Sequence, residues 1–170
     1  MRLNKTTAQA GTSLPELMVT VLLIGTFFAS IFEVNAVCLR YINATKESVA
    51  AIESVQDRME KLRSLAFTDL TKTSYMKDTV LIAPANASVQ AKRVTEEVTI
   101  SDYNDPSTSL TYTRAAGASV APSNTPAGAF SFPATTSIVK VKVKHTWNMT
   151  LNGRTRSEET ESIISNGVKK

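Results

Sequence analysis

The chain has 170 residues, enough for one modest domain and an appendage. Apolar residues make up 42% and charged residues 20% of the sequence, which indicates a globular protein and excludes a disordered one. The net charge of +4 is too small for a protein that coats nucleic acid. The single cysteine, Cys38, excludes a disulfide within the chain; we expect it to pack on a helix, with a bridge between subunits as the alternative.

The most apolar part of the sequence is residues 17–32, which carry no charge. As a helix they would extend about 24 Å at about 1.5 Å per residue, a little less than the roughly 30 Å hydrocarbon core of a bilayer. Continuation to Arg40 makes the length adequate, with Glu33 as the only charge on the way. Glu33 must then snorkel or find a partner. The sequence predicts a single membrane span.

The residues before this apolar segment decide between three kinds of targeting sequence. A secretory signal peptide has its small-residue cleavage site after the apolar region, whereas the small residues here end at Gly11, before it. A plain signal anchor explains the segment and keeps Arg2 and Lys5 in the cytoplasm. It does not explain why Glu16 stands directly against the apolar segment. A type IV prepilin leader is short and basic, ends in glycine and leaves the apolar segment in the mature protein.

The residues AGTSLPEL at positions 10–17 resemble the cleavage and methylation signature of type IV pilins and type II secretion pseudopilins. In that family cleavage follows the glycine, the new terminal amine is methylated, and the fifth mature residue is glutamate. The resemblance implies cleavage between Gly11 and Thr12, methylation of the Thr12 amine and a role in assembly for Glu16. The first mature residue of the family is most often phenylalanine, so Thr12 is a departure from the pattern.

The resemblance also implies a location, a set of partners and the absence of catalytic activity. The chain would cross the bacterial inner membrane once, with residues 1–11 as a cytoplasmic leader and a periplasmic head. A prepilin peptidase and methyltransferase would process it. An inner-membrane assembly platform and other pilin or pseudopilin subunits would then incorporate it into a filament.

Elementary electrostatics gives Glu16 a role of its own. A carboxylate in the membrane costs about 2.5 to 3.5 kcal/mol on translocon scales unless it finds a partner. Cleavage would create a cationic amine at Thr12. In a staggered bundle, Glu16 of a subunit already in the filament could meet that amine of the incoming subunit. Ser13 and Glu16 also fit a capping box with Pro15 in the first turn, and the two roles are compatible.

We assign residues 12–67 to one long N-terminal helix, membrane-spanning in its first half and amphipathic in its second. No glycine or proline occurs between Gly25 and Pro84 to interrupt it. Gly25 and Ala29 form a small-xxx-small pair, which permits close approach of helices in lipid. An apolar stripe in the second half should pack on the protein's own head, and consists of Ile42, Val49, Ile52, Val55, Met59, Leu62 and Leu65.

Residues 68–170 are expected to form a β-sheet head, because the apolar pattern there changes to a period of two. The candidate strands are residues 80–83, 94–103, 110–113, 139–151 and 154–164. The fold class is therefore α+β and pilin-like, with a long N-terminal helix packed against a small C-terminal antiparallel sheet. Residues 115–133 are predicted to be a loop, with Phe130 and Phe132 either in the core or on a contact surface.

The last two strands are expected to form a hairpin. Asn152-Gly153 is a strong two-residue turn signal, and such a turn would set Lys144 opposite Glu161. The returning strand is rich in charge and suits a sheet edge. The valine-rich strand with Trp147, the Asn-Gly-Arg turn at 152–154 and the isoleucines at 163–164 resemble the ending of minor pilins and minor pseudopilins, which implies an accessory subunit.

Neither a metal site nor another cofactor is expected. His145 lies on the apolar face of its strand, and we expect a satisfied histidine of the core or of the sheet edge there. With no second histidine and no paired cysteines, a zinc site is not predicted. Asp102, Asn104 and Asp105 carry enough oxygens for calcium. Their spacing does not follow a regular calcium loop, and the segment is first a turn signal.

Two alternatives to the pilin hypothesis remain open. One is a single-pass anchored binding or sensor domain that does not polymerise. The other is a DNA-binding head, in which Lys140, Lys142 and Lys144 would contact phosphates. The lysines have no aromatic residue on their own face, so we expect a solvated strand face and no nucleic-acid partner.

Overall fold

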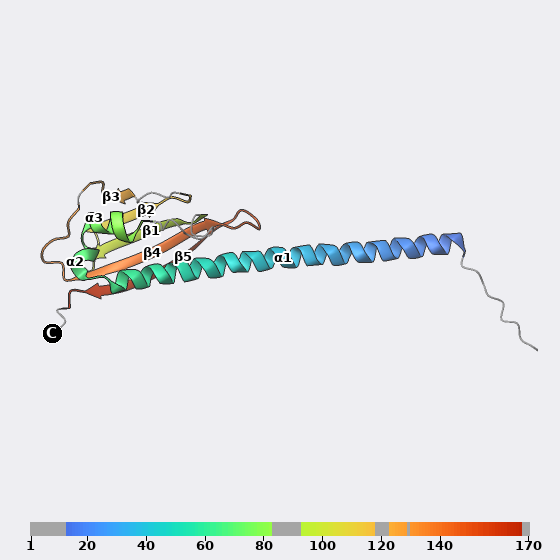
Figure 1. Cartoon of the computed structure of the whole chain (residues 1–170), viewed down its shortest axis with the longest axis horizontal. Helices are drawn as coiled ribbons and strands as arrows, with labels where there is room; N and C mark the ends of the chain where they lie inside the picture. The colour runs from blue at the N-terminus through green and yellow to red at the C-terminus, as the bar shows by residue number, and fades with distance from the viewer. Residues whose placement is uncertain (1–12, 83–92, 118–122, 129, 168–170) are drawn as a thin grey trace, which may run out of the picture. The chain divides into compact units, whose positions relative to one another are not determined.

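The computed structural model describes residues 13–82, 93–117, 123–128 and 130–167 (Figure 1). The expected leader, residues 1–11, and Thr12 lie outside these residues. The chain divides into two units, residues 1–42 and residues 43–170. The first contains the start of the long helix, and the second contains the rest of that helix together with the sheet.

Helix α1 (Leu14–Ser64) has 51 residues and confirms the predicted long N-terminal helix. It begins at the expected place, where Leu17 N–H donates to the Ser13 carbonyl at 3.2 Å. Lys61 and Arg63 stand in its last turn, where positive charge complements the carbonyl end of the helix dipole. The absence of glycine and proline after Gly25 allows this length.

The head contains a five-stranded antiparallel sheet with the order β3-β2-β1-β4-β5. Its strands are β1 (Thr95–Asp102), β2 (Ser109–Arg114), β3 (Ser123–Thr125), β4 (Ile138–Asn148) and β5 (Thr155–Ser165). Buried and partly exposed residues alternate strictly along β1 and β4. One face of the sheet is therefore covered and the other faces outward. The predicted antiparallel sheet is confirmed, and β5 is an edge strand as expected.

The β4–β5 turn is longer than predicted. Met149 pairs with Arg154, so the loop has four residues, 150–153, and Gly153 has a φ of +67°. Lys144 consequently faces Glu159, and Lys142 faces Glu161, so the predicted pairing of Lys144 with Glu161 is wrong. The pairing moves by two residues, which leaves every side chain on the face assigned from the sequence. Lysines still meet glutamates across the strands.

The core lies between the covered face of the sheet and the second half of α1 (Figure 1). Val55, Met59 and Leu62 of the predicted stripe are buried in it. Ile42, Val49 and Ile52 are exposed by 40% or more, so this part of the predicted stripe is wrong. Small residues replace them on the packed face. At the rim of the core, Ala51 packs against the bulky Trp147, together with Val94.

Three short helical segments connect α1 to the sheet: α2 (Phe67–Leu70), α3 (Thr73–Tyr75) and the π-helical turn η1 (Met76–Val80). The strand predicted at residues 80–83 is therefore wrong for its described residues, and residue 83 lies outside them. The turn is closed by Leu81 N–H donating to the Met76 carbonyl at 2.9 Å. Because both side chains are fully buried, this wide turn places two core residues where a strand could not.

The long loop predicted at residues 115–133 contains the short strand β3, which pairs with β2 and was not predicted. Phe130 and Phe132 pack against the core, which decides between the two places considered for them. Their rings meet edge to face, with centroids 5.0 Å apart and planes at 87°. This is a favoured arrangement for two aromatic rings.

Candidate functional site

The Glu16 side chain is exposed in the first turn of α1. Its backbone carbonyl accepts a hydrogen bond from the Thr20 hydroxyl at 2.8 Å. Among the described residues its carboxylate forms no hydrogen bond or ion pair. The predicted capping-box bonds between Ser13 and Glu16 are absent there, although the helix does begin after Ser13. The carboxylate is therefore available to a group outside the described residues.

The apolar start of α1 is not covered by any of the described residues. Its large apolar side chains from Leu14 to Leu39 have exposed fractions between 39% and 76%. By length and composition, α1 contains one candidate membrane span close to the N-terminus. An apolar surface of this size is stable only in lipid or against other protein.

The structure places Gly25 and Ala29 one turn apart on this exposed part of α1. A methyl group added at Gly25 would meet nothing within 4 Å, so its own chain does not require glycine there. Cys38 is exposed and unpaired, and does not pack against described residues as expected for a buried cysteine. The predicted cleavage and methylation residues, Gly11 and Thr12, lie outside the described residues.

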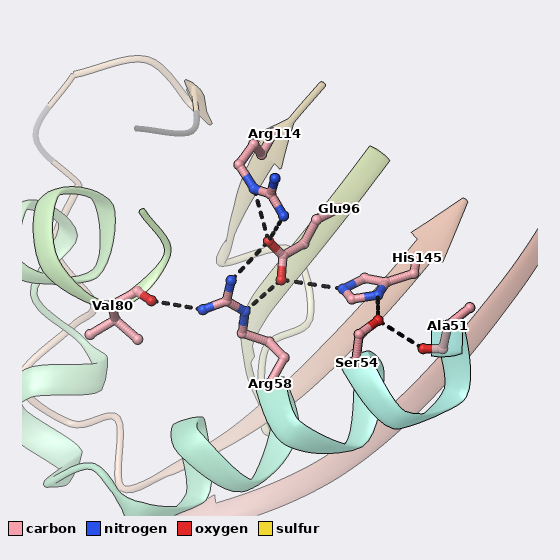
Figure 2. A network of polar contacts seen from close by, with 7 residues as sticks. All are labelled: Ala51, Ser54, Arg58, Val80, Glu96, Arg114 and His145. Atoms are coloured by element: carbon pink, nitrogen blue, oxygen red, sulfur yellow. Dashed lines mark hydrogen bonds and ion pairs between the residues drawn. The ribbon is translucent and has the colours of Figure 1, made fainter. Parts of the chain in front are cut away.

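A second group of polar side chains lies inside the head, and we call it the buried charge network. It consists of Ser54, Arg58, Glu96, Arg114 and His145 (Figure 2). Glu96 is at its centre, with only 3% of its surface exposed. The members come from α1, β1, β2 and β4, so the network connects the helix to three strands.

The two arginines hold Glu96 from opposite sides (Figure 2). Arg58 donates from Nε to Oε1 at 2.5 Å and from Nη2 to Oε2 at 3.1 Å. Arg114 donates to Oε2 from Nη2 at 2.8 Å and from Nε at 3.1 Å. Arg58 also donates to the Val80 carbonyl at 2.7 Å, which ties η1 to the same group.

The ionisation of Glu96 follows from these contacts. Burial would raise the pKa of Glu96, but the hydrogen bond from His145, the charge of Arg58 and the hydrogen bonds from both arginines outweigh burial and lower the pKa strongly. Glu96 is therefore ionised at neutral pH. Such a group suits a structural role, because its oxygens are already occupied by donors from the chain itself.

His145 completes the network. Its Nε2 lies 3.3 Å from Glu96 Oε1, and its Nδ1 lies 2.9 Å from the Ser54 hydroxyl. Nε2 carries the proton toward the ionised carboxylate. The expectation that His145 is a satisfied core histidine is confirmed, since it is 4% exposed and has a partner at each nitrogen.

Glu96, Arg58 and Arg114 were not predicted as site residues, although the sequence pattern contains a signal for them. Glu96 shares its side of β1 with Val98 and Ile100, and Arg114 shares its side of β2 with Leu110 and Tyr112. Arg58 lies on the helix face of Val55, Met59 and Leu62. Charges of opposite sign at inward positions of three adjacent elements predict a buried ion pair.

The candidate calcium residues form a turn stabilised by hydrogen bonds. Asp102 accepts from Asn104 N–H at 2.8 Å and from the Thr136 hydroxyl, and these bonds lower its pKa, with the Thr136 bond the larger cause. Asp105 accepts from the hydroxyls of Ser107 and Thr108 at 2.5 and 2.8 Å. Among the described residues no group of three potential metal ligands is found.

The lysines considered for DNA contact lie on the outward face of β4, and two of them are paired. Lys140 Nζ lies 2.7 Å from Glu161, and Lys142 Nζ lies 2.9 Å from Glu159. These diagonal cross-strand pairs form a surface ladder between β4 and β5. Its glutamates offset the positive charge that a phosphate backbone would require.

Comparison with known proteins gives no relative for this chain. No protein-family model matches it, and neither a curated protein nor a solved structure matches it. The function must therefore be argued from the residues and the geometry alone.

Proposed function

We propose that this chain is a subunit, of the minor kind, of a type IV pilus or a type II secretion pseudopilus. It is inserted into the bacterial inner membrane as a prepilin and cut between Gly11 and Thr12. It then joins a filament through the N-terminal part of α1. In this role it has no catalytic activity, and its processing partner is a prepilin peptidase and methyltransferase.

One observation carries the proposal: Glu16 is exposed, and has no partner among the described residues, at the start of a helix whose apolar side chains are also exposed. Lipid alone would satisfy the apolar side chains, but it would leave the carboxylate unpaired. A neighbouring subunit that offers the Thr12 amine would satisfy both. This requirement favours a filament subunit over a plain membrane anchor.

The head supports the same role, because its buried carboxylate Glu96 is paired within the fold. Glu96 and His145 are satisfied by side chains of the head, and the outward lysines Lys140 and Lys142 pair with glutamates. Such a head is suited to be carried as a folded body on the filament. The single-pass anchored domain remains the alternative, because it would use the same span and the same head.

Mass spectrometry of the mature N-terminus tests the proposal. The chain, expressed with a prepilin peptidase, is expected to begin at Thr12 and to carry one added methyl group on its amine. A Gly11→Leu variant serves as the control, because a bulky residue at the cleavage position should leave Met1 in place. An unprocessed N-terminus in the unaltered chain would contradict the proposal and favour the anchored domain.

A further inference from the structure

Glu33 and Arg40 are the only charged residues of α1 between Glu16 and Lys46. Both are exposed. Among the described residues, neither side chain forms a hydrogen bond or an ion pair. Each is therefore an isolated charge within a largely apolar stretch of helix, where an unpaired charge is costly.

Glu33 and Arg40 lie on the same face of the helix, but they are too far apart along its axis to pair within one chain. Seven residues advance an α-helix by about 10.5 Å and by almost two whole turns. The carboxylate and the guanidinium consequently point in nearly the same direction at different heights. If a second, parallel helix is displaced along the axis by seven residues, the carboxylate of one helix lies level with the guanidinium of the other.

Most side chains on the helix face around Glu33 are small, and Val37 is the bulky exception on this face. At about 100° per residue, Thr26, Ala29, Ser30 and Ala36 fall on this side, and the bulky Phe28 and Ile31 fall on the other. The hydroxyls of Thr26 and Ser30 donate to their own helix, to the carbonyls of residues 23 and 27, at 2.9 and 2.8 Å. They therefore need no partner, and the face permits close approach of another helix.

We propose that Glu33 pairs with Arg40 of a second copy of this chain, parallel to the first and displaced along the helix axis by seven residues. The proposal rests on the proposed filament function, applies where copies of this chain adjoin one another in the filament, and names the contact that sets the displacement between them. In a level pair of helices, the two Glu33 side chains would face each other and so would the two Arg40 side chains. Both contacts are repulsive, so charge alone disfavours the level arrangement.

The displaced arrangement has a consequence for the assembly. Each copy pairs through Glu33 with one neighbour and through Arg40 with another, so the contact is heterologous. The copy at one end of the row then has an unpaired Glu33, and the copy at the other end has an unpaired Arg40. Heterologous contacts that do not close into a ring produce open helical filaments. The pair also places both charges in an ion pair instead of leaving them alone in lipid.

The test is disulfide crosslinking of the full chain in membranes that contain the peptidase and the assembly machinery. All chains carry Cys38→Ser, and two forms are expressed together, one with Ser30→Cys and one with Val37→Cys. Positions 30 and 37 are seven residues apart and lie on the same side of the helix as Glu33. The proposed displacement therefore brings position 30 of one copy level with position 37 of the next. The mixed product, which joins position 30 of one copy to position 37 of another, should exceed both same-position products.

The charges are then varied in this crosslinking background. Glu33→Gln should lower the yield of the mixed product about three- to twentyfold, the range expected for a polar pair between membrane helices. Glu33→Arg should lower it further, and Glu33→Arg combined with Arg40→Glu should restore it. Asn35→Ala is the matched control, because Asn35 has nearly the same depth on the opposite side and should change nothing. Circular dichroism and protease resistance of the head verify folding of each variant.

Three outcomes would overturn the inference. If the chain is cut at Gly11 and enters filaments while Glu33→Gln leaves the mixed product unchanged, the pairing is wrong and the proposed function stands. If Arg40→Glu alone lowers the yield and the double reversal does not restore it, Arg40 contacts lipid phosphate instead of Glu33. If the N-terminus stays uncut and no product forms at any position, both the pairing and the proposed function are wrong.

Discussion

Two glutamates of this chain, Glu96 in the head and Glu33 in the first part of α1, have opposite surroundings. Glu96 is almost completely buried and receives hydrogen bonds from two arginines and a histidine of its own chain. Glu33 is exposed, and the described residues give it no partner. The same type of side chain is thus fully paired within the fold in one unit and has no partner among the described residues in the other.

The comparison separates what the chain does alone from what it needs other molecules to do. In the head, inward charges are matched within the fold, and the core is filled by apolar residues of the helix and the sheet. In residues 14–39, the large apolar side chains are exposed, and the charges of Glu16 and Glu33 have no partner among the described residues. Stability should therefore be determined by the head, and assembly by the N-terminal part of α1.

The largest effect is expected from Glu96→Ala in the full chain in detergent. It leaves two arginines buried without their counter-ion, and breaking a buried pair in this way costs about 3 to 5 kcal/mol. Urea unfolding can be followed by the fluorescence of Trp147, the only tryptophan, which is buried in the head. Glu33→Ala is the matched control, and should change the free energy of unfolding by less than about 0.5 kcal/mol. An equal loss of unfolding free energy in Glu96→Ala and Glu33→Ala would contradict the difference between a paired Glu96 and an unpaired Glu33.

Acid should destabilise the head through Glu96. Its pKa is lowered in the folded state from a usual value of 4.5, so the unfolded chain binds this proton at a higher pH than the folded chain does. The stabilisation is complete above pH 4.5 and is lost progressively as the pH falls below it toward the folded-state value. The free energy of unfolding, measured between pH 6 and 3, should decline less steeply for Glu96→Gln than for the unaltered chain. An identical decline in both would assign the acid sensitivity to other carboxylates.

Alkaline pH should destabilise the head through Tyr112. Burial raises the pKa of this tyrosine to about 12, because the buried ring hydroxyl would carry its charge away from water. The unfolded chain releases the proton near pH 10 and the folded chain retains it, so stability falls as the pH rises above 10. Two pKa units correspond to about 2 to 3 kcal/mol. Tyr112→Phe removes the ionising group, and its unfolding free energy should lack this component; a loss of the same size in the variant would show that another group is responsible.

The smallest effect is expected at the outward ladder of β4 and β5. Lys142→Ala removes a cross-strand ion pair whose partners are both well exposed, and such pairs contribute about 0 to 1 kcal/mol. Urea unfolding at low and high salt measures this contribution. A loss as large as that of Glu96→Ala would mean that the ladder, and not the buried charge network, determines the stability of the head.

Much of the fold was predictable from local patterns. The absence of helix breakers predicted α1, and the period of two predicted β1, β2, β4 and β5. The helical segments at residues 67–80 were missed because tertiary burial of Met76 and Leu81 overrides the β-propensity of the Val-Leu-Ile sequence there. The β4–β5 register was missed because Asn152-Gly153 is compatible with a four-residue loop as well as with the predicted turn.

The candidate sites were predictable to different degrees. The assembly role of Glu16 is a prediction from a short motif and its position, and the structure adds that the side chain is exposed at the start of α1. The buried charge network depends on which inward residues of α1, β1 and β2 meet in space. The pairing of Arg58 and Arg114 with Glu96 was not predicted, because the sequence does not give the distances between α1, β1 and β2. His145 was placed correctly, since its strand alternates without interruption.

The most direct test of the account is the incorporation of Glu16→Ala into filaments. The variant and the unaltered chain are expressed with the complete assembly machinery, and filaments sheared from the cells are compared with the membrane fraction. We expect the variant to be cut before Thr12 and inserted in the membrane with a folded head, but to be absent from the filaments. Incorporation equal to that of the unaltered chain would contradict the claim that this carboxylate is the contact that assembly completes.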